Sequence, residues 1–225
     1  MIDSLHLYDQ LLQFTLFQGM SRSELLQLAG NTRFGFQKIQ AGKWVVHEGD
    51  SCNQFHFLVG GTVSVLTQSD AHTYCVMESL QAPWLMEPAS LFGLTTRYRH
   101  TVQAQTDAHF ITLSKDEVLR LLDDFLIIRL NLLNILSTQV QRGSHRPWRT
   151  VPVTLYDRVV RFFVDHVAYP AGRKEFRILM RQLAVEVGAT RLNVSRVLNQ
   201  MEQRGLVELR RGSIVIPLLE HLLMT

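Results

Sequence analysis

The spacing of apolar and polar residues changes along the chain, and each change indicates a different kind of structure. Residues 4–30 show the spacing of short helices, and Ser21 is a suitable N-cap for a helix over Arg22–Ala29. From Arg33 to Leu113, short runs rich in β-branched and aromatic residues recur about every ten residues, as in a jelly roll or β-roll. The predicted strands are Phe34–Ile39, Trp44–His47, Phe55–Val59, Thr62–Leu66, Tyr74–Leu80, Thr101–Gln105 and His109–Leu113.

A long amphipathic helix is predicted to begin after Ser114, where Glu117 would complete a capping box. Two apolar seams run along it in alternating steps of three and four residues. The first seam is Val118, Leu121, Phe125, Ile128, Leu132 and Ile135, and the second is Leu122, Leu126, Arg129, Leu133, Leu136 and Val140. One seam is enough to cover the helix's own domain, so the second predicts a partner, most simply the same helix of a second copy. The alternative is one broad core face in a monomer.

Residues 180–199 have the spacing of a helix-turn-helix. Ala184 is small where two helices would cross closely, and Gly188 suits the turn because glycine accepts a positive φ. Thr190 is a natural N-cap for a second helix that continues to about Arg204. The predicted buried faces are Leu183, Val187, Val194, Val197 and Leu198. Apolar runs over Leu206–Leu209 and Ile214–Ile216 flank Arg210-Arg211-Gly212-Ser213, which predicts a wing hairpin with a basic tip.

The second helix would present side chains that can read DNA. An arginine can form two hydrogen bonds to guanine, an asparagine can do the same to adenine, and the first turns of such a helix enter the major groove. The predicted DNA-binding residues are Arg181, Gln182, Thr190, Arg191, Leu192, Asn193, Ser195, Arg196, Asn199, Arg210 and Arg211. The alternative is an ordinary helix pair whose arginines are only solvated.

Charge and composition support this interpretation. The part from Arg142 onward has 14 Lys or Arg against 7 Asp or Glu, a net charge of +7, whereas the whole chain carries +3. A basic C-terminal part is expected to bind a polyanion. With 46% hydrophobic residues the chain can build a core, and its two cysteines are too few for a disulfide framework or an iron–sulfur cluster. No secretory signal or spanning segment is visible, so we expect a cytoplasmic protein with no membrane contact.

With these motifs the chain resembles the bacterial Crp/Fnr-type transcription regulators, the cyclic-AMP receptor protein family. The resemblance covers the β-roll with Gly42, the Glu48-Gly49-Asp50 turn and residues 57–63, the helix after Ser114, and the run from Val187 to Leu198. It implies a homodimer that binds a two-fold symmetric site on double-stranded DNA and contacts RNA polymerase. We therefore expect an α+β protein with a β-roll sensor domain over 1–113, a dimerisation helix over 114–142, a hinge over 143–152 and a winged helix-turn-helix domain over 153–225.

The resemblance also marks departures in both halves. Arg191 and Arg196 match family arginines that read bases, but Leu192 replaces a glutamate of many members and could contact a thymine methyl instead. In the sensor, Pro88 stands at the position of a ribose-binding glutamate and Tyr98 at that of the phosphate-binding arginine. Arg99 comes one residue late, and a shift of one residue in a strand reverses the side chain's face. We therefore expect no cyclic nucleotide binding, unless a slip of one residue in the loop restores Arg99.

An unidentified small-molecule effector is still compatible with the sequence. Its predicted pocket is Trp84, Met86, Glu87, Leu94, Tyr98, Arg99 and His100, and the alternative is that these residues simply fill the roll. No metal, cofactor or catalysis is expected. Two alternative functions are compatible with the sequence: a cyclic-nucleotide-responsive regulator, and a cupin-like metal-binding protein with a DNA-binding tail.

Overall fold

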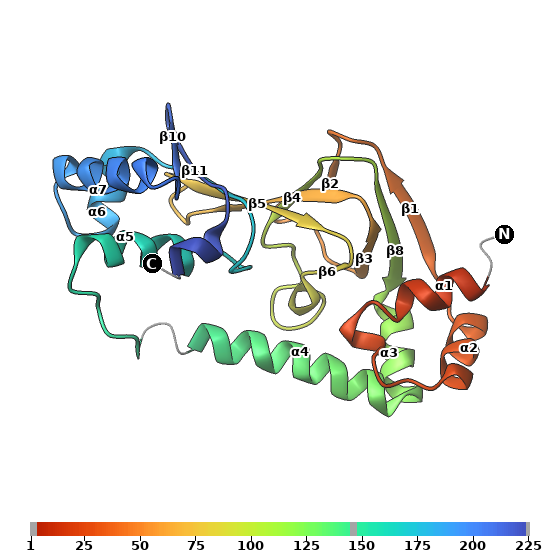
Figure 1. Cartoon of the computed structure of the whole chain (residues 1–225). Coiled ribbons are helices and arrows are strands. Elements are labelled where there is room, and N and C mark those ends of the chain that lie inside the picture. The colour runs from red at the N-terminus through yellow and green to blue at the C-terminus, as the bar shows by residue number, and fades with distance from the viewer. Residues whose placement is uncertain (1–3, 145–147, 224–225) are drawn as a thin grey trace. The chain divides into compact units, whose positions relative to one another are not determined.

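The computed structural model describes residues 4–144 and 148–223, which form two compact units (Figure 1). The first, called the β-roll unit, comprises residues 1–63 and 80–145. The second, called the C-terminal unit, comprises residues 64–79 and 146–225. The end of one β-hairpin thus groups with helices that follow it much later in the chain, although the order of residues gives no reason to expect this. The predicted hinge over 143–152 includes residues 145–147, which lie outside the described residues.

The β-roll unit consists of short helices, a roll of antiparallel strands and a pair of C-terminal helices. Its helical elements are α1 (Ser4–Leu11), η1 (Thr15–Phe17), α2 (Arg22–Asn31), η2 (Pro88–Leu91), α3 (Lys115–Asp124) and α4 (Leu126–Ser144). Its strands are β1 (Gly35–Ile39), β2 (Trp44–Val46), β3 (Gln54–Gly60), β6 (Trp84–Met86), β7 (Thr101–Ala104) and β8 (Ala108–Ser114). The unit also includes the first two residues of β4 (Thr62–Gln68) and the last two of β5 (Cys75–Gln81).

The core of this unit lies between its N-terminal helices and one sheet. The sheet has the order β1-β8-β3-β6, and β2 pairs separately with β7. Phe57 of β3 is fully buried, and its ring lies 5.0 Å from that of Phe14 and 5.6 Å from that of Phe17. Edge-to-face and tilted contacts of this kind add to the burial of apolar area. The N-terminal helices are therefore an integral part of the roll.

Every strand predicted in the roll is present, whereas β6 was not predicted. Only three residues long, β6 follows Pro83, so it carries no periodic signal of its own. It forms because residues 84–86 pair with His56, Phe57 and Leu58 of β3. A strand that forms mainly because it pairs with a neighbouring strand cannot be predicted from the local spacing of apolar residues.

The prediction of a single long helix after Ser114 is wrong in one respect, because the helical segment is divided into α3 and α4. Phe125 at the junction has extended backbone (φ −126°, ψ 102°). The Arg129 side chain donates from Nε to the Leu122 carbonyl oxygen at 2.7 Å and from Nη2 to that of Asp123 at 3.3 Å. These bonds satisfy carbonyls at the end of α3, which lack partners within the helix.

The capping box predicted at Ser114 is only half formed. The Ser114 hydroxyl accepts the backbone N–H of Glu117 as expected. The Glu117 carboxylate does not return to Ser114, since it accepts from Arg120 Nη2 at 2.8 Å and from the backbone N–H of Arg33 at 3.4 Å. Ser21 and Glu24, in contrast, form a complete capping box at the start of α2.

The C-terminal unit is a winged helix-turn-helix completed by the β4–β5 hairpin. Its remaining elements are α5 (Leu155–Asp165), β9 (Lys174–Arg177), α6 (Met180–Glu186), α7 (Arg191–Gln203), β10 (Glu208–Arg210), β11 (Ser213–Ile216) and η4 (Leu219–Leu223). Helix α5 begins after the N-cap Thr154, whose hydroxyl accepts the backbone N–H of Asp157, and it ends at Asp165. Strand β9 was not predicted, because three of its four residues are charged and its alternation of apolar and polar residues is too short to recognise. Among the described residues, no helix is long and apolar enough to span a membrane.

Candidate DNA-binding interface

The helix-turn-helix is built on a continuous apolar core. The residues of α6 and α7 that face this core are Leu183, Ala184, Val187, Val194, Leu198 and Met201, each at most 5% exposed, with Val197 only partly buried. Gly188 in the turn has φ +60°, the left-handed conformation for which glycine was predicted. Arg158 of α5 donates from Nη1 to the carbonyl oxygens of Val187 at 2.9 Å and Gly188 at 3.1 Å, and so fixes the turn from a third helix.

The opposite side of α7 is exposed along its first two turns. Thr190 caps the helix, since its hydroxyl accepts the backbone N–H of Asn193 at 3.3 Å. The exposed residues are Thr190, Arg191, Leu192, Asn193, Arg196 and Asn199, whereas Ser195 is partly buried. Within the part of the chain that the structure covers, neither Arg191 nor Arg196 forms an ion pair of 4 Å or less. The positive end of the helix dipole and two available guanidinium groups therefore lie together.

Helix α6 and the wing supply further basic groups, although some are already engaged. Arg181 is exposed, while Gln182 is partly buried and donates to Glu186 Oε1 at 2.9 Å. In the wing, β10 and β11 pair through Arg210 and Ser213, and the exposed Arg211 stands in the turn between them. Arg210 Nη2 lies 2.9 Å from Glu208 Oε2, an exposed pair that a phosphate could displace at small cost.

The predicted effector residues differ in their burial. Trp84 and Met86 are buried in the roll at 8% and 1% exposure, whereas Leu94 is fully exposed. Tyr98 is buried at 4% and the next residue, Arg99, is exposed; both precede β7, which begins at Thr101. The Glu87 carboxylate is occupied by the protein itself, because it accepts the backbone N–H groups of Arg99 at 2.9 Å and His100 at 3.1 Å. That these seven residues line an effector pocket stays a prediction.

A hydrogen-bonded cluster fills the roll beside Tyr98. The Tyr98 hydroxyl lies 3.1 Å from Nδ1 of His56, and Nε2 of the same imidazole lies 3.2 Å from Nε2 of Gln54. Burial lowers the pKa of His56 to about 4, because the charged imidazolium would lose its hydration. Burial also raises the pKa of Tyr98 well above its ordinary value. The cluster is therefore neutral at physiological pH, which does not favour an anionic ligand.

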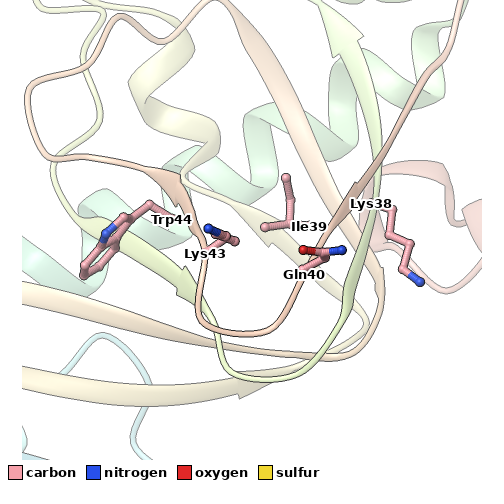
Figure 2. Close-up of a pocket in the computed structure, with 5 residues that line it drawn as sticks. All are labelled: Lys38, Ile39, Gln40, Lys43 and Trp44. Carbon is pink, nitrogen blue, oxygen red and sulfur yellow. The ribbon is translucent and has the colours of Figure 1, made fainter.

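One depression in the roll lies elsewhere. It has a volume of about 370 Å³ and is lined by Lys38, Ile39, Gln40, Lys43 and Trp44 of β1, β2 and the turn between them. Figure 2 shows the side chains of Lys38 and Trp44 pointing away from each other at its two ends. Lys38 Nζ is paired with Asp107 Oδ2 at 3.0 Å. None of the seven predicted effector residues lines this depression. In residues 4–144 and 148–223, no three His, Cys, Asp or Glu side chains lie close enough to hold a metal ion.

The two seams of α3 and α4 differ in burial as predicted. In the first seam, Val118, Leu121, Phe125, Ile128 and Leu132 are buried and Ile135 is partly buried. In the second, Leu126, Leu133 and Val140 are 63%, 53% and 68% exposed, Arg129 is exposed, and Leu122 and Leu136 are partly buried. The first seam covers the roll, and the second is an apolar strip that the described chain leaves open.

Two groups in the C-terminal unit were missed by reasoning from the sequence. Arg158 fixes the turn before α7 through its bonds to the carbonyl oxygens of Val187 and Gly188. Glu78 and Lys174 form a fully buried ion pair, yet Glu78 lies in a strand of the predicted roll. None of these three residues belongs to a local motif, so only the contacts in the folded structure show their roles.

Comparison with known proteins identifies both halves of this arrangement. The family model described as "Cyclic nucleotide-binding domain" matches residues 36–125, and that described as "Crp-like helix-turn-helix domain" matches residues 157–224. No curated protein matches the chain in sequence.

Similar solved structures extend over almost the whole chain. The catabolite activator protein of Thermus thermophilus is 20% identical with a TM-score of 0.54, covering 93% of this chain and 96% of that one. A protein from Eubacterium rectale described as a transcriptional regulator of the Crp/Fnr family is 18% identical with a TM-score of 0.52, covering 94% and 97%. The sensor domain of the regulator DNR from Pseudomonas aeruginosa is 21% identical with a TM-score of 0.54, covering 67% and 97%.

At these identities the likeness shows a shared fold. The two family models add a cyclic nucleotide-binding-like domain followed by a Crp-like DNA-binding domain, in that order and over most of the chain. Members with this combination are transcription regulators rather than enzymes. The chain therefore belongs to the Crp/Fnr family of DNA-binding transcription regulators.

Proposed function

We propose that this chain regulates transcription as a homodimer that reads a two-fold symmetric DNA site through α7 and the wing. The observation that carries the proposal is the exposed side of α7, where Arg191, Leu192 and Arg196 stand on a helix capped by Thr190. Arginines on the first turns of such a helix can form two hydrogen bonds to a guanine, whereas the wing arginines would contact phosphates. Contact with RNA polymerase is part of the proposal through the family alone.

The second seam supports the proposed dimer. Its apolar side chains lie on one strip of α4, and three of them are more than half exposed. A second copy of the same strip would cover these side chains by knobs-into-holes packing. Two α7 helices held by such a dimer would face half-sites about one DNA turn apart. Dimerisation and DNA reading are thus two parts of one arrangement.

We further propose that the β-roll does not respond to cyclic nucleotides. Tyr98 occupies the place of the family's phosphate-binding arginine, and its hydroxyl is committed to His56 inside the roll. Arg99, the nearest candidate for the missing cation, is exposed. A buried neutral cluster offers no compensation for the charge of a cyclic phosphate. The effector, if the protein uses one, belongs to another chemical class.

The DNA-binding proposal is tested by selecting sites from random duplexes and measuring affinity by fluorescence anisotropy at several salt concentrations. The selected site should be an inverted repeat. Arg191→Ala should lower affinity for that site by about 1–3 kcal/mol and relax preference at one base pair in each half-site. Arg22→Ala is the matched control, because Arg22 is also exposed but lies on α2.

Two outcomes would contradict the proposal. If no sequence is enriched by the selection, then α7 does not read bases. If Arg191→Ala lowers affinity equally for selected and random duplexes, Arg191 contributes only a charge. In both cases the exposed basic side of α7 would need another explanation, such as non-specific attraction to polyanions.

A further inference from the structure

The β4–β5 hairpin is a structural part of the DNA-binding unit, although its sequence belongs to the predicted roll. Strand β5 pairs with β9 through four consecutive residue pairs, from Cys75 with Arg177 to Glu78 with Lys174. On its other side β9 pairs with β11 of the wing. Val76 of β5 is 2% exposed and lies in the same core cluster as the helix-turn-helix. The DNA-binding core is therefore incomplete without the hairpin.

A buried ion pair fixes the hairpin in this place. Glu78 Oε1 lies 3.0 Å from Lys174 Nζ, and both side chains are completely buried. The same carboxylate accepts the backbone N–H groups of Ala168 at 2.9 Å and Tyr169 at 3.1 Å, in the connection between α5 and β9. Glu78 thus neutralises the lysine and holds the segment that leads into β9. Removing one partner of a buried pair leaves an uncompensated charge, which is strongly unfavourable.

A second contact anchors the other end of the docked strand. The Tyr74 hydroxyl lies 3.0 Å from Nε2 of His166 at the end of α5, and Nδ1 of His166 lies 2.7 Å from the Phe162 carbonyl oxygen. Since Nδ1 must donate to that carbonyl, Nε2 is the ring nitrogen that faces the Tyr74 hydroxyl. The hairpin is therefore held at both ends by polar contacts and between them by apolar packing.

We propose that Glu78 is a positioning residue for DNA binding, and that the docked β4–β5 hairpin is the DNA-binding-competent form of the C-terminal unit. The link to DNA is β9, because Lys174 pairs with Glu78 on one side and with Ile216 of β11 on the other. If the hairpin leaves, the lysine must leave the interior to be hydrated, which displaces β9 from its register with the wing. The wing turn that carries Arg211 would then lose its fixed position.

The inference rests on the proposed function, since it concerns how the DNA-reading surface is held. It adds a route by which the sensor part can act on DNA affinity. The hairpin begins and ends outside the C-terminal unit, because residues 62–63 of β4 and 80–81 of β5 belong to the β-roll unit. A change in the roll that pulls on these strands would reach the wing without passing through α4.

The first test compares DNA affinities of charge variants at equal folded fraction, measured on the selected site. Glu78→Gln should weaken binding at least about tenfold, because it leaves the Lys174 ammonium buried without a counter-charge. Adding Lys174→Met should restore most of the affinity, since the pair is then replaced by groups that carry no charge. Asp70→Asn is the matched control, as it removes one exposed negative charge from the same hairpin.

A double-mutant cycle separates positioning from general destabilisation. If Glu78 acts through the wing, Glu78→Gln should cost much less affinity when Arg211→Ala has already removed the wing contact. Independent, additive losses in the two variants would overturn the proposed route through the wing. Failure of Lys174→Met to rescue Glu78→Gln would overturn the role of the charge pair.

A cross-link tests the competent state directly, even if the charge variants fold poorly. Arg177→Cys places a thiol opposite Cys75, and directly opposed residues on antiparallel strands are close enough for a disulfide. After treatment with oxidised glutathione, the cross-linked protein should bind the selected site at least as tightly as the same preparation after reduction. Loss of binding on oxidation, recovered with reductant, would show that docking inhibits the protein, and absence of a cross-link would show that the hairpin is not docked. Failure of the unmodified chain to bind any selected site would instead refute the proposed function.

Discussion

Leu192 offers the sharpest test of how the exposed side of α7 reads DNA. Its side chain is 61% exposed, and at 100° per residue it lies on the side of the helix opposite the buried Val194 and Leu198. An apolar side chain cannot accept a hydrogen bond from a base. In the major groove the one apolar group that a base presents is the C5-methyl of thymine. We therefore expect thymine at the position of the selected site that faces Leu192.

The size of the effect follows from the area that such a contact removes from water. Burying one methyl-sized group contributes about 0.8 kcal/mol, which corresponds to about a fourfold change in affinity. Deoxyuridine differs from thymidine only by this methyl group, so it deletes the contact from the DNA side. Leu192→Ala deletes it from the protein side. Each change alone should weaken binding about fourfold per half-site, and the two together should cost little more than one.

The assay is a double-mutant cycle of fluorescence anisotropy titrations with thymine and deoxyuridine duplexes. A second deoxyuridine duplex, substituted at a thymine outside the half-sites, controls for changes in DNA shape. Leu192→Glu should in addition shift the selected base toward cytosine, because the cytosine amino group can donate a hydrogen bond to a carboxylate. Equal affinity for the two duplexes, or equal sensitivity to deoxyuridine in Leu192→Ala, would refute the reasoning.

Three further outcomes are expected. Leu133→Glu in the second seam should convert the dimer to a monomer in sedimentation, with Asn134→Glu on the same helix as the control, and an unchanged mass would remove the dimer argument. Cyclic AMP should leave DNA affinity unchanged in the anisotropy assay, because Tyr98 fills the place of the phosphate-binding group; a large increase would contradict this. Burial lowers the pKa of His56 from 6.5 to about 4. Between pH 4 and pH 6.5, the His56 imidazole is therefore protonated in the unfolded chain and neutral in the folded chain. Stability should therefore fall by up to about 3 kcal/mol as the pH drops from 6.5 to 4, and urea unfolding of His56→Gln should lack this slope.

The candidate site could be predicted largely because its signals are local. Thr190 caps α7 by accepting the backbone N–H of Asn193, three positions away, and Gly188 allows the turn because it adopts a positive φ. The effector pocket could not be predicted in the same way. Whether Leu94 faces a cavity or solvent depends on the path of its loop, which no periodic pattern specifies. The break at Phe125 was missed for a similar reason, because apolar periodicity continues across it.

By itself, the sequence determined the kinds of elements, their order, the two seams of the long helical segment and the residues that α7 exposes. These follow from spacings of a few residues, where propensity, capping and periodicity act. Only the tertiary structure decided that β5 completes the DNA-binding unit and that Glu78 belongs beside Lys174. The hydrogen bond from Ala168 to Glu78 joins residues 90 positions apart. A contact at that separation is fixed by the packing of the whole unit and by the cost of burying an unpaired charge, neither of which a local stretch of residues contains.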